Sequence, residues 1–229
     1  MQLSWHMVVH LGEASLMFPL AGVVVFRLAW QGQWRRAFHW VLSLGAGTAA
    51  ILLGKLAFEL GGWSVPSANV YSVSGHAMLT AAVYPVLFAV TGEAWSPRAV
   101  RLGALAGVGA ALMAAVALVA GRYHTVSETL IGMSVGFIVA WANLHRPRRW
   151  LSIDRPPAIA RLVLCAVLVV MIPVSLYPIR TRLLSHGMTW LGVSERYTRI
   201  IGIDPASGRT IVTVVPLPLP SYRKTSDLF

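Results

Sequence analysis

Residues 102–121 read LGALAGVGAALMAAVALVAG, an uncharged run of 20 residues between Arg101 and Arg122. As a helix this run rises about 30 Å, which matches the hydrocarbon thickness of a bilayer. Gly103 and Gly107, four residues apart, favour close packing against a neighbouring helix. The whole chain has 229 residues, of which 56% are hydrophobic and 12% charged, and its mean hydropathy is +0.67. These values exclude an ordinary soluble globule and predict an all-α, polytopic transmembrane helical bundle.

Apolar runs continue on both sides of this stretch. We expect six spans, at residues 14–30, 37–60, 76–92, 102–121, 126–144 and 162–179. The bundle then occupies residues 1–179, and residues 180–229 form a C-terminal tail outside the membrane. Within the tail, residues 199–203 and 210–215 flank Asp204-Pro-Ala-Ser-Gly208, which predicts a short β-hairpin. No chemical motif is apparent in this tail.

The charged residues indicate an orientation for the bundle. The net charge of +11 arises mostly from residues between the apolar runs, so we do not expect a nucleic-acid partner. The first, third and fifth connections carry nine basic residues, whereas the N-terminus and the other two connections carry only Lys55 and Arg122. The positive-inside rule therefore predicts an outward-facing N-terminus and C-terminus. Few lysines beside many arginines favour a bacterial inner membrane, with the second and fourth connections facing the periplasm.

The second connection ends in Ser72-Val-Ser-Gly-His76, directly before an apolar span. Ser74 suits the N-cap of that helix, and Gly75 allows a close backbone approach. The N–H groups at a helix start can bind phosphate oxygens, and His76 in the first turn can present its imidazole to a leaving group. The alternative is an ordinary helix cap without a chemical role.

The fourth connection reads Arg122-Tyr-His-Thr-Val-Ser-Glu128. His124 and Glu128 are four residues apart, so they share a face if a helix begins here. A carboxylate that accepts the proton of one imidazole nitrogen leaves the other nitrogen free to attack. Arg122 adds a planar cation suited to phosphate. The alternative is a His–Glu pair that caps a helix at the membrane interface.

Together, the two segments resemble signature motifs of the type 2 phosphatidic acid phosphatase (PAP2) superfamily, over roughly residues 55–132. In that family a Ser-Gly-His motif precedes one transmembrane helix, an Arg…His-x-x-x-Asp motif opens a later one, and a lysine motif ends an earlier one. The resemblance implies that His124 is the nucleophile, Glu128 its orienting partner and His76 the acid for the leaving oxygen. It assigns phosphate binding to Lys55, Ser74, Gly75 and Arg122.

The sequence departs from the family pattern at several positions. Gly62 and Trp63 stand where the family has an Arg-Pro pair, and Val73 replaces a common proline. Arg122 precedes His124 by only two residues, a shorter interval than in the family, and Glu128 replaces aspartate. Lys55 also has Glu59 one helical turn away, so an ion pair between the two is an alternative to phosphate binding.

These observations predict an integral membrane phosphatase or phosphotransferase that acts on a lipid phosphate or diphosphate through a phosphohistidine. No cofactor and no catalytic metal are expected. His6, His10 and Glu13 lie near one helical face and form a competing metal constellation, although their place before the first span favours interface residues. A catalytically inactive family member and an anion-lipid binding or transport protein are the alternative functions.

Overall fold

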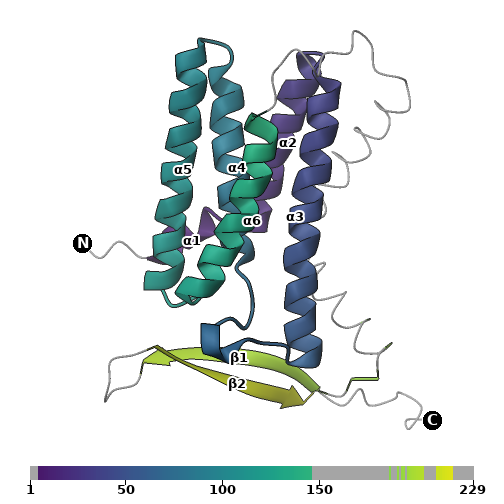
Figure 1. Ribbon diagram of the computed structural model, residues 1–229, viewed down its shortest axis with the longest axis vertical. Coiled ribbons are helices and arrows are strands. Elements are labelled where there is room, and N and C mark those ends of the chain that lie inside the picture. The colour runs from purple at the N-terminus through teal and green to yellow at the C-terminus, as the bar shows by residue number, and fades with distance from the viewer. Residues whose placement is uncertain are drawn as a thin grey trace, which may run out of the picture.

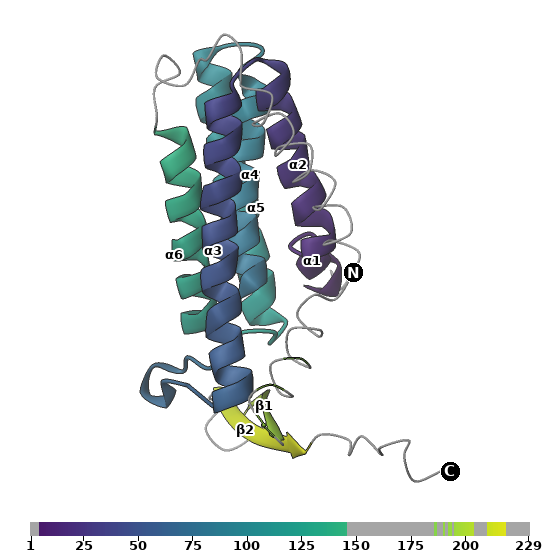
Figure 2. The same ribbon diagram turned by 90° about the vertical axis from the view of Figure 1, so that its right-hand side faces the viewer.

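The computed structural model of the protein describes residues 5–145, 186, 190, 192–193, 195–203 and 210–218. Figures 1 and 2 show a bundle of long helices with a two-stranded sheet across one end. In chain order the elements are α1 (Trp5–His10), α2 (Ala14–Trp30), α3 (Trp34–Gly61), the 3-10 helix η1 (Pro66–Ala68), α4 (Gly75–Gly92), α5 (Pro97–Ala120), α6 (Val126–Leu144), β1 (Glu195–Ile203) and β2 (Thr210–Pro218).

The predicted helical bundle is confirmed. Among the described residues, four helices are long and apolar enough to cross a membrane, namely α3, α4, α5 and α6, and α2 is apolar but has only 17 residues. The predicted spans at residues 14–30 and 126–144 coincide with α2 and α6. The predicted span at 162–179 lies outside the described residues.

Helix α5 begins five residues before the predicted span. Ser96 caps it by accepting a hydrogen bond from the N–H of Ala99 at 3.0 Å, and Pro97 occupies the first turn. Serine at the N-cap followed by proline is a strong helix start. Arg98 and Arg101 therefore lie in the first turns of the helix, where the sequence pattern had placed them in a connection.

Helix α4 is the centre of the bundle, because 14 of its 18 residues are buried. Glycines on the neighbouring helices allow this close packing. A Cβ atom added at Gly103 of α5 would overlap the backbone of Phe88, and one added at Gly132 of α6 would overlap the carbonyl oxygen of Ser74. The packing role predicted for Gly103 is therefore confirmed, and α6 contacts the start of α4 through its backbone.

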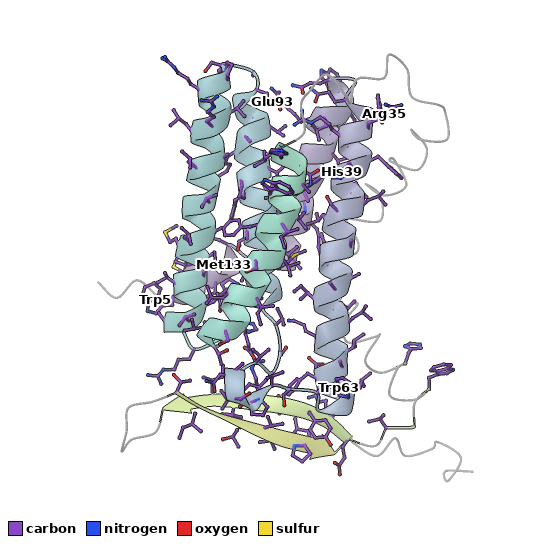
Figure 3. The ribbon with its side chains drawn as sticks, viewed as in Figure 1. Trp5, Arg35, His39, Trp63, Glu93 and Met133 are labelled. Atoms are coloured by element: carbon purple, nitrogen blue, oxygen red, sulfur yellow. The ribbon has the colours of Figure 1, made fainter. Side chains whose placement is uncertain are left out.

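The two ends of the bundle carry different polar groups. Figure 3 shows Arg35, His39 and Glu93 toward one end and Trp63 at the other, beside the sheet. At the first end, Arg36 of α3 binds Glu93 after α4 through an ion pair of 3.0 Å, with both side chains less than 10% exposed. This pair lies at the end of the bundle remote from the sheet.

Strands β1 and β2 form the predicted hairpin, with nine residues in each strand. They pair antiparallel from Glu195 opposite Pro218 to Ile203 opposite Thr210. The sheet crosses the end of the bundle at which α3 ends and α6 begins (Figure 1). The hairpin and the loops 62–74 and 121–125 therefore share one end of the molecule.

Candidate active site

The segment Ser72 to His76 forms the start of α4. Ser74 is the N-cap residue, and its Oγ accepts a hydrogen bond from the N–H of Ala77 at 3.2 Å. Its side chain is fully buried, whereas Gly75 and His76 are partly exposed. The Nζ atom of Lys55, from α3, lies 3.8 Å from the position that a Cβ of Gly75 would occupy. The predicted lysine and the Ser-Gly-His segment are thus brought together.

Helix α6 begins with a capping box. Thr125 is the N-cap, its Oγ1 accepts from the N–H of Glu128 at 3.2 Å, and the N–H of Thr125 donates to Oε2 of Glu128 at 3.3 Å. The Thr125 hydroxyl also donates to the carbonyl of Asn69 at 2.7 Å. This cap places His124 just before the helix, with Glu128 in its first turn.

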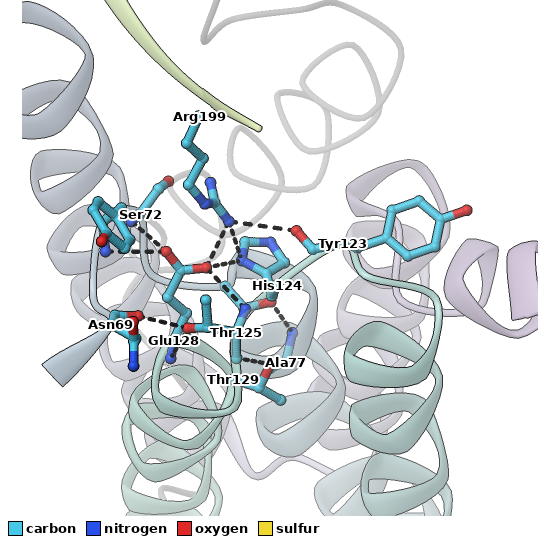
Figure 4. A network of polar contacts seen from close by, with 11 residues as sticks. Asn69, Ser72, Ala77, Tyr123, His124, Thr125, Glu128, Thr129 and Arg199 are labelled. Carbon is cyan, nitrogen blue, oxygen red and sulfur yellow. Dashed lines mark hydrogen bonds and ion pairs between the residues drawn. The ribbon is translucent and has the colours of Figure 1, made fainter. Parts of the chain in front are cut away.

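The carboxylate of Glu128 joins the two motif loops (Figure 4). One oxygen, Oε1, accepts hydrogen bonds from the N–H groups of Tyr71 at 3.0 Å and Ser72 at 2.8 Å. The other oxygen, Oε2, lies 2.9 Å from Nδ1 of His124. Glu128 is completely buried, so these partners replace water for its charge. The predicted His124–Glu128 pair is present, and Glu128 also holds the loop that leads to His76.

His76 faces the same region from α4. The N–H of Ser74 donates to the carbonyl oxygen of Glu128 at 3.3 Å, which ties the two helix starts together through their backbones. The charges of Lys55 and His124 both act on His76, as do those of Glu13 and His10. The two histidines and the lysine therefore belong to one electrostatic cluster at one end of the bundle.

An arginine from the C-terminal hairpin completes this cluster. Nη2 of Arg199 lies 2.6 Å from Oε2 of Glu128 and 2.8 Å from Nδ1 of His124 (Figure 4). The same nitrogen donates to the carbonyl of Tyr123 at 3.4 Å. The sequence of the tail contains no motif that predicts this contact. The strand that contains Arg199 was predicted, but no local pattern links Arg199 to residues more than 70 positions earlier in the chain.

The surroundings of His124 keep its imidazole neutral near pH 7. Burial lowers the pKa of His124 below its ordinary value of 6.5, and the positive charges of Arg199 and Lys55 act in the same direction. The hydrogen bond that the ring makes to Glu128, together with the negative charge of that carboxylate, opposes this shift without reversing it. A neutral imidazole whose Nδ1–H is donated to Glu128 has a free lone pair on Nε2, which a nucleophile requires.

The comparisons with known proteins concern the same part of the chain. A family model described as PAP2 superfamily matches residues 51–152, which include Lys55, both histidines and Glu128. This region belongs to the PAP2 superfamily. The resemblance predicted from the motifs is thus confirmed, and the superfamily implies a phosphatase or phosphotransferase that acts on phosphate esters, often those of lipids.

Further relatives add little to this assignment. The chain is 23% identical over 135 residues to a protein of Klebsiella pneumoniae described as an uncharacterized 22.5 kDa protein in the cps region. The match covers 58% of this chain and 65% of that protein, so the chain spans less than two thirds of the relative's length. No solved structure matches the chain.

Two positions show how this PAP2 region departs from the family pattern. Gly62, at the position where the family motif has arginine, is the C-cap of α3 with φ +67°. Arg122 also has positive φ, at +61°, and its side chain is exposed. It lines a cavity of about 200 Å³ together with His124, Thr125 and hairpin residue Ile201. Arg122 is therefore near His124 but absent from the hydrogen-bonded cluster around Glu128.

His10 and Glu13, two of the three residues of the competing metal constellation, pair with each other. Nδ1 of His10 pairs with Oε1 of Glu13 across the turn between α1 and α2. Gly12 of this turn packs against α4, where an added Cβ would lie 3.3 Å from Cβ of His76. The side chain of His6 lies outside what the structure describes. Within the described residues, no group of three histidine, cysteine, aspartate or glutamate side chains forms a metal site.

Proposed function

We propose that this protein is a membrane-embedded phosphatase, or a phosphotransferase with the same intermediate, that acts on a lipid phosphate or diphosphate. The observation that carries the proposal is the position of Glu128. Its buried carboxylate binds Nδ1 of His124 through one oxygen and the backbone before His76 through the other. One side chain thus orients the nucleophile and sets its distance from the proposed acid.

The first step forms a phosphohistidine. His124 donates its Nδ1–H to Glu128 and attacks phosphorus through Nε2. The bond from phosphorus to the leaving oxygen breaks, and His76 gives that oxygen a proton. A phosphate dianion beside His76 favours the protonated imidazole that this step needs. In the second step, water or another acceptor attacks the phosphohistidine, His76 takes the proton of the attacking hydroxyl, and Nε2 of His124 regains its lone pair.

The phosphate would bind where the positive charges and free N–H groups meet. The ammonium of Lys55 lies beside Gly75, and the first N–H groups of α4 have no acceptor within their own helix. The positive end of the helix dipole adds to this attraction. Charge that spreads over the phosphoryl oxygens during transfer is stabilised by such preorganised donors. Arg122, on the neighbouring cavity wall, would bind the second phosphate of a diphosphate or the leaving group.

A lipid substrate suits the location of the cluster. The cluster lies at one end of α3, α4, α5 and α6, the four described helices that are long and apolar enough to span a membrane. A head group can therefore reach His124 while its acyl or prenyl chain remains in the hydrocarbon layer. By the distribution of basic residues, this end faces the periplasm of a bacterial inner membrane.

The experiment that tests the proposal measures phosphate release by the purified protein in proteoliposomes. The substrates are phosphatidic acid, phosphatidylglycerophosphate and a prenyl diphosphate, with a water-soluble phosphate ester as comparison. We expect activity on a lipid substrate that falls at least 10³-fold in His124→Ala and is retained in His145→Ala, which removes an exposed histidine beyond the end of α6. Activity that is unchanged in His124→Ala, or absent toward every lipid, would reject the proposed function.

A further inference from the structure

We propose that the C-terminal hairpin is part of the active site and that Arg199 is a positioning residue for Glu128 and His124. The inference rests on the proposed function, because it assigns a role in the same reaction. It extends the site beyond residues 51–152, the part of the chain that the PAP2 superfamily model matches. Residues of the hairpin would then be required for activity.

The contacts of Arg199 define this role. Its side chain is 12% exposed, and its partner Glu128 is completely buried. Nη2 reaches Oε2 of Glu128 at 2.6 Å, the same oxygen that faces Nδ1 of His124. Arginine can only donate hydrogen bonds, so the carboxylate oxygen is the acceptor that orders both groups. When Nδ1 carries the proton, the imidazole and the guanidinium both donate to this one oxygen, and Nη2, 2.8 Å from Nδ1, contacts the ring without donating to it.

Arg199 also balances the charge around the nucleophile. The charged groups that act on His124 are Lys55 from α3, Glu128 from α6 and Arg199 from β1, and His124 in turn acts on His76 of α4. Without Arg199, the buried negative charge of Glu128 would act on His124 with less compensation and would favour its protonated form. Protonated His124 has no lone pair on Nε2 for attack. The guanidinium therefore allows Glu128 to orient His124 while the imidazole stays neutral.

The hairpin contacts Gly62, the position at which the family motif has arginine. At Gly62, where the resemblance has arginine, an added Cβ would lie 3.3 Å from the ring of Tyr197 in β1. The positive φ of Gly62 would also strain any larger residue. An arginine at this position would therefore be strained and would need the ring of Tyr197 to shift. Arg199, two residues after Tyr197, brings a positive charge to the site from β1.

The first test compares Arg199→Ala and Arg199→Lys with Arg196→Ala in proteoliposomes. Arg196 is a matched control, because it lies on the same strand, three residues away and therefore on the opposite face, and is exposed. We expect kcat to fall about 100-fold in Arg199→Ala, partial activity in Arg199→Lys, and no change in Arg196→Ala. Millimolar guanidinium ion should restore part of the activity of Arg199→Ala, a rescue that a purely structural role would not allow. Full activity or increased activity of Arg199→Ala would overturn the inference, and an increase would show that the hairpin inhibits the site.

A second measurement does not require activity. The protein is labelled with ¹³C-histidine, and the resonance of His124 is assigned from its loss in His124→Ala. We expect the pKa of His124 to rise in Arg199→Ala, because one of the positive charges that lower it is removed, and to stay unchanged in Arg196→Ala. An unchanged titration of His124 in Arg199→Ala would contradict the inference. If the titration shifts while the wild-type protein releases no phosphate from any lipid, the contact is upheld and the proposed function fails.

Discussion

Replacing Glu128 by glutamine removes one charge from the centre of the site while nearly preserving its shape. The amide oxygen can still accept from Tyr71 and Ser72, whose N–H groups bind Oε1 at 3.0 and 2.8 Å. The amide nitrogen then faces the N–H of Thr125, the guanidinium of Arg199 and Nδ1 of His124, which all point toward Oε2. Donors would meet donors at Thr125 and Arg199, so these two contacts are lost, and His124 can keep its contact only by moving its proton from Nδ1 to Nε2.

The cost can be worked out for stability and for rate. Removing one partner of a buried ion pair costs about 3–5 kcal/mol, and we take the lower end because Arg199 retains some exposure to water. By the scaling for soluble domains of this length, about 3 kcal/mol lowers the melting temperature by roughly 6–12 °C. The effect on rate is larger, since the amide favours an imidazole with its proton on Nε2. In a comparable His–carboxylate pair this change costs about 10⁴-fold in kcat, and we expect a loss of 10³- to 10⁴-fold here.

The assay measures the initial rate of phosphate release and the thermal unfolding of the same detergent-purified sample. Glu93→Gln is the matched control, because Glu93 is also a buried partner of an arginine, at the opposite end of the bundle. We expect that variant to lose stability and keep its kcat. A folded Glu128→Gln protein with wild-type kcat would refute the claim that this carboxylate orients the nucleophile.

Three further predictions concern pH, packing and metal ions. Because the pKa of His124 is lowered, the acidic limb of the kcat/KM profile should have its midpoint below pH 6.5, and a midpoint at or above 6.5 would contradict the proposed neutral nucleophile. Gly132→Ala should lower the free energy of unfolding by about 1–3 kcal/mol and reduce kcat, since the new Cβ overlaps the carbonyl oxygen of Ser74. Gly109→Ala is the control, because its new Cβ meets no atom within 4 Å, and it should change neither quantity. Equal melting temperatures for the two variants would argue against close packing of α6 on the start of α4. Activity should persist after dialysis against EDTA, whereas a loss that zinc restores would reverse the metal-independent mechanism.

The helices were predictable from the sequence because length and hydropathy determine them directly. The run at 102–121 and the cap at Ser74 rest on local patterns, which the structure retains. The first turn of α5 was missed because Arg98 and Arg101 resemble a charged connection. The cap formed by Ser96 and Pro97 was the stronger signal.

The candidate site was predictable only where its residues are near in sequence. The four-residue interval between His124 and Glu128 placed them on one helical face. The second role of Glu128, binding the N–H groups of Tyr71 and Ser72, joins segments 56 or more residues apart. Arg199 lies still farther along the chain, in a strand. The alternating pattern of that strand predicts a sheet, but it does not indicate which face carries a function. Such long-range contacts depend on tertiary packing, and no spacing rule encodes them.

The most direct test of the central claim is to trap the phosphorylated enzyme. Protein incubated with a lipid substrate labelled in its phosphate is quenched in alkali, which preserves phosphohistidine, and the modified peptide is mapped by mass spectrometry. We predict one phosphoryl group on His124 in the wild-type protein, none in His124→Ala, and accumulation in a variant that cannot complete the second step, such as His76→Ala tested with a substrate whose leaving group needs no proton. Phosphate on another residue, or turnover by the wild-type protein without any labelled histidine, would contradict the mechanism.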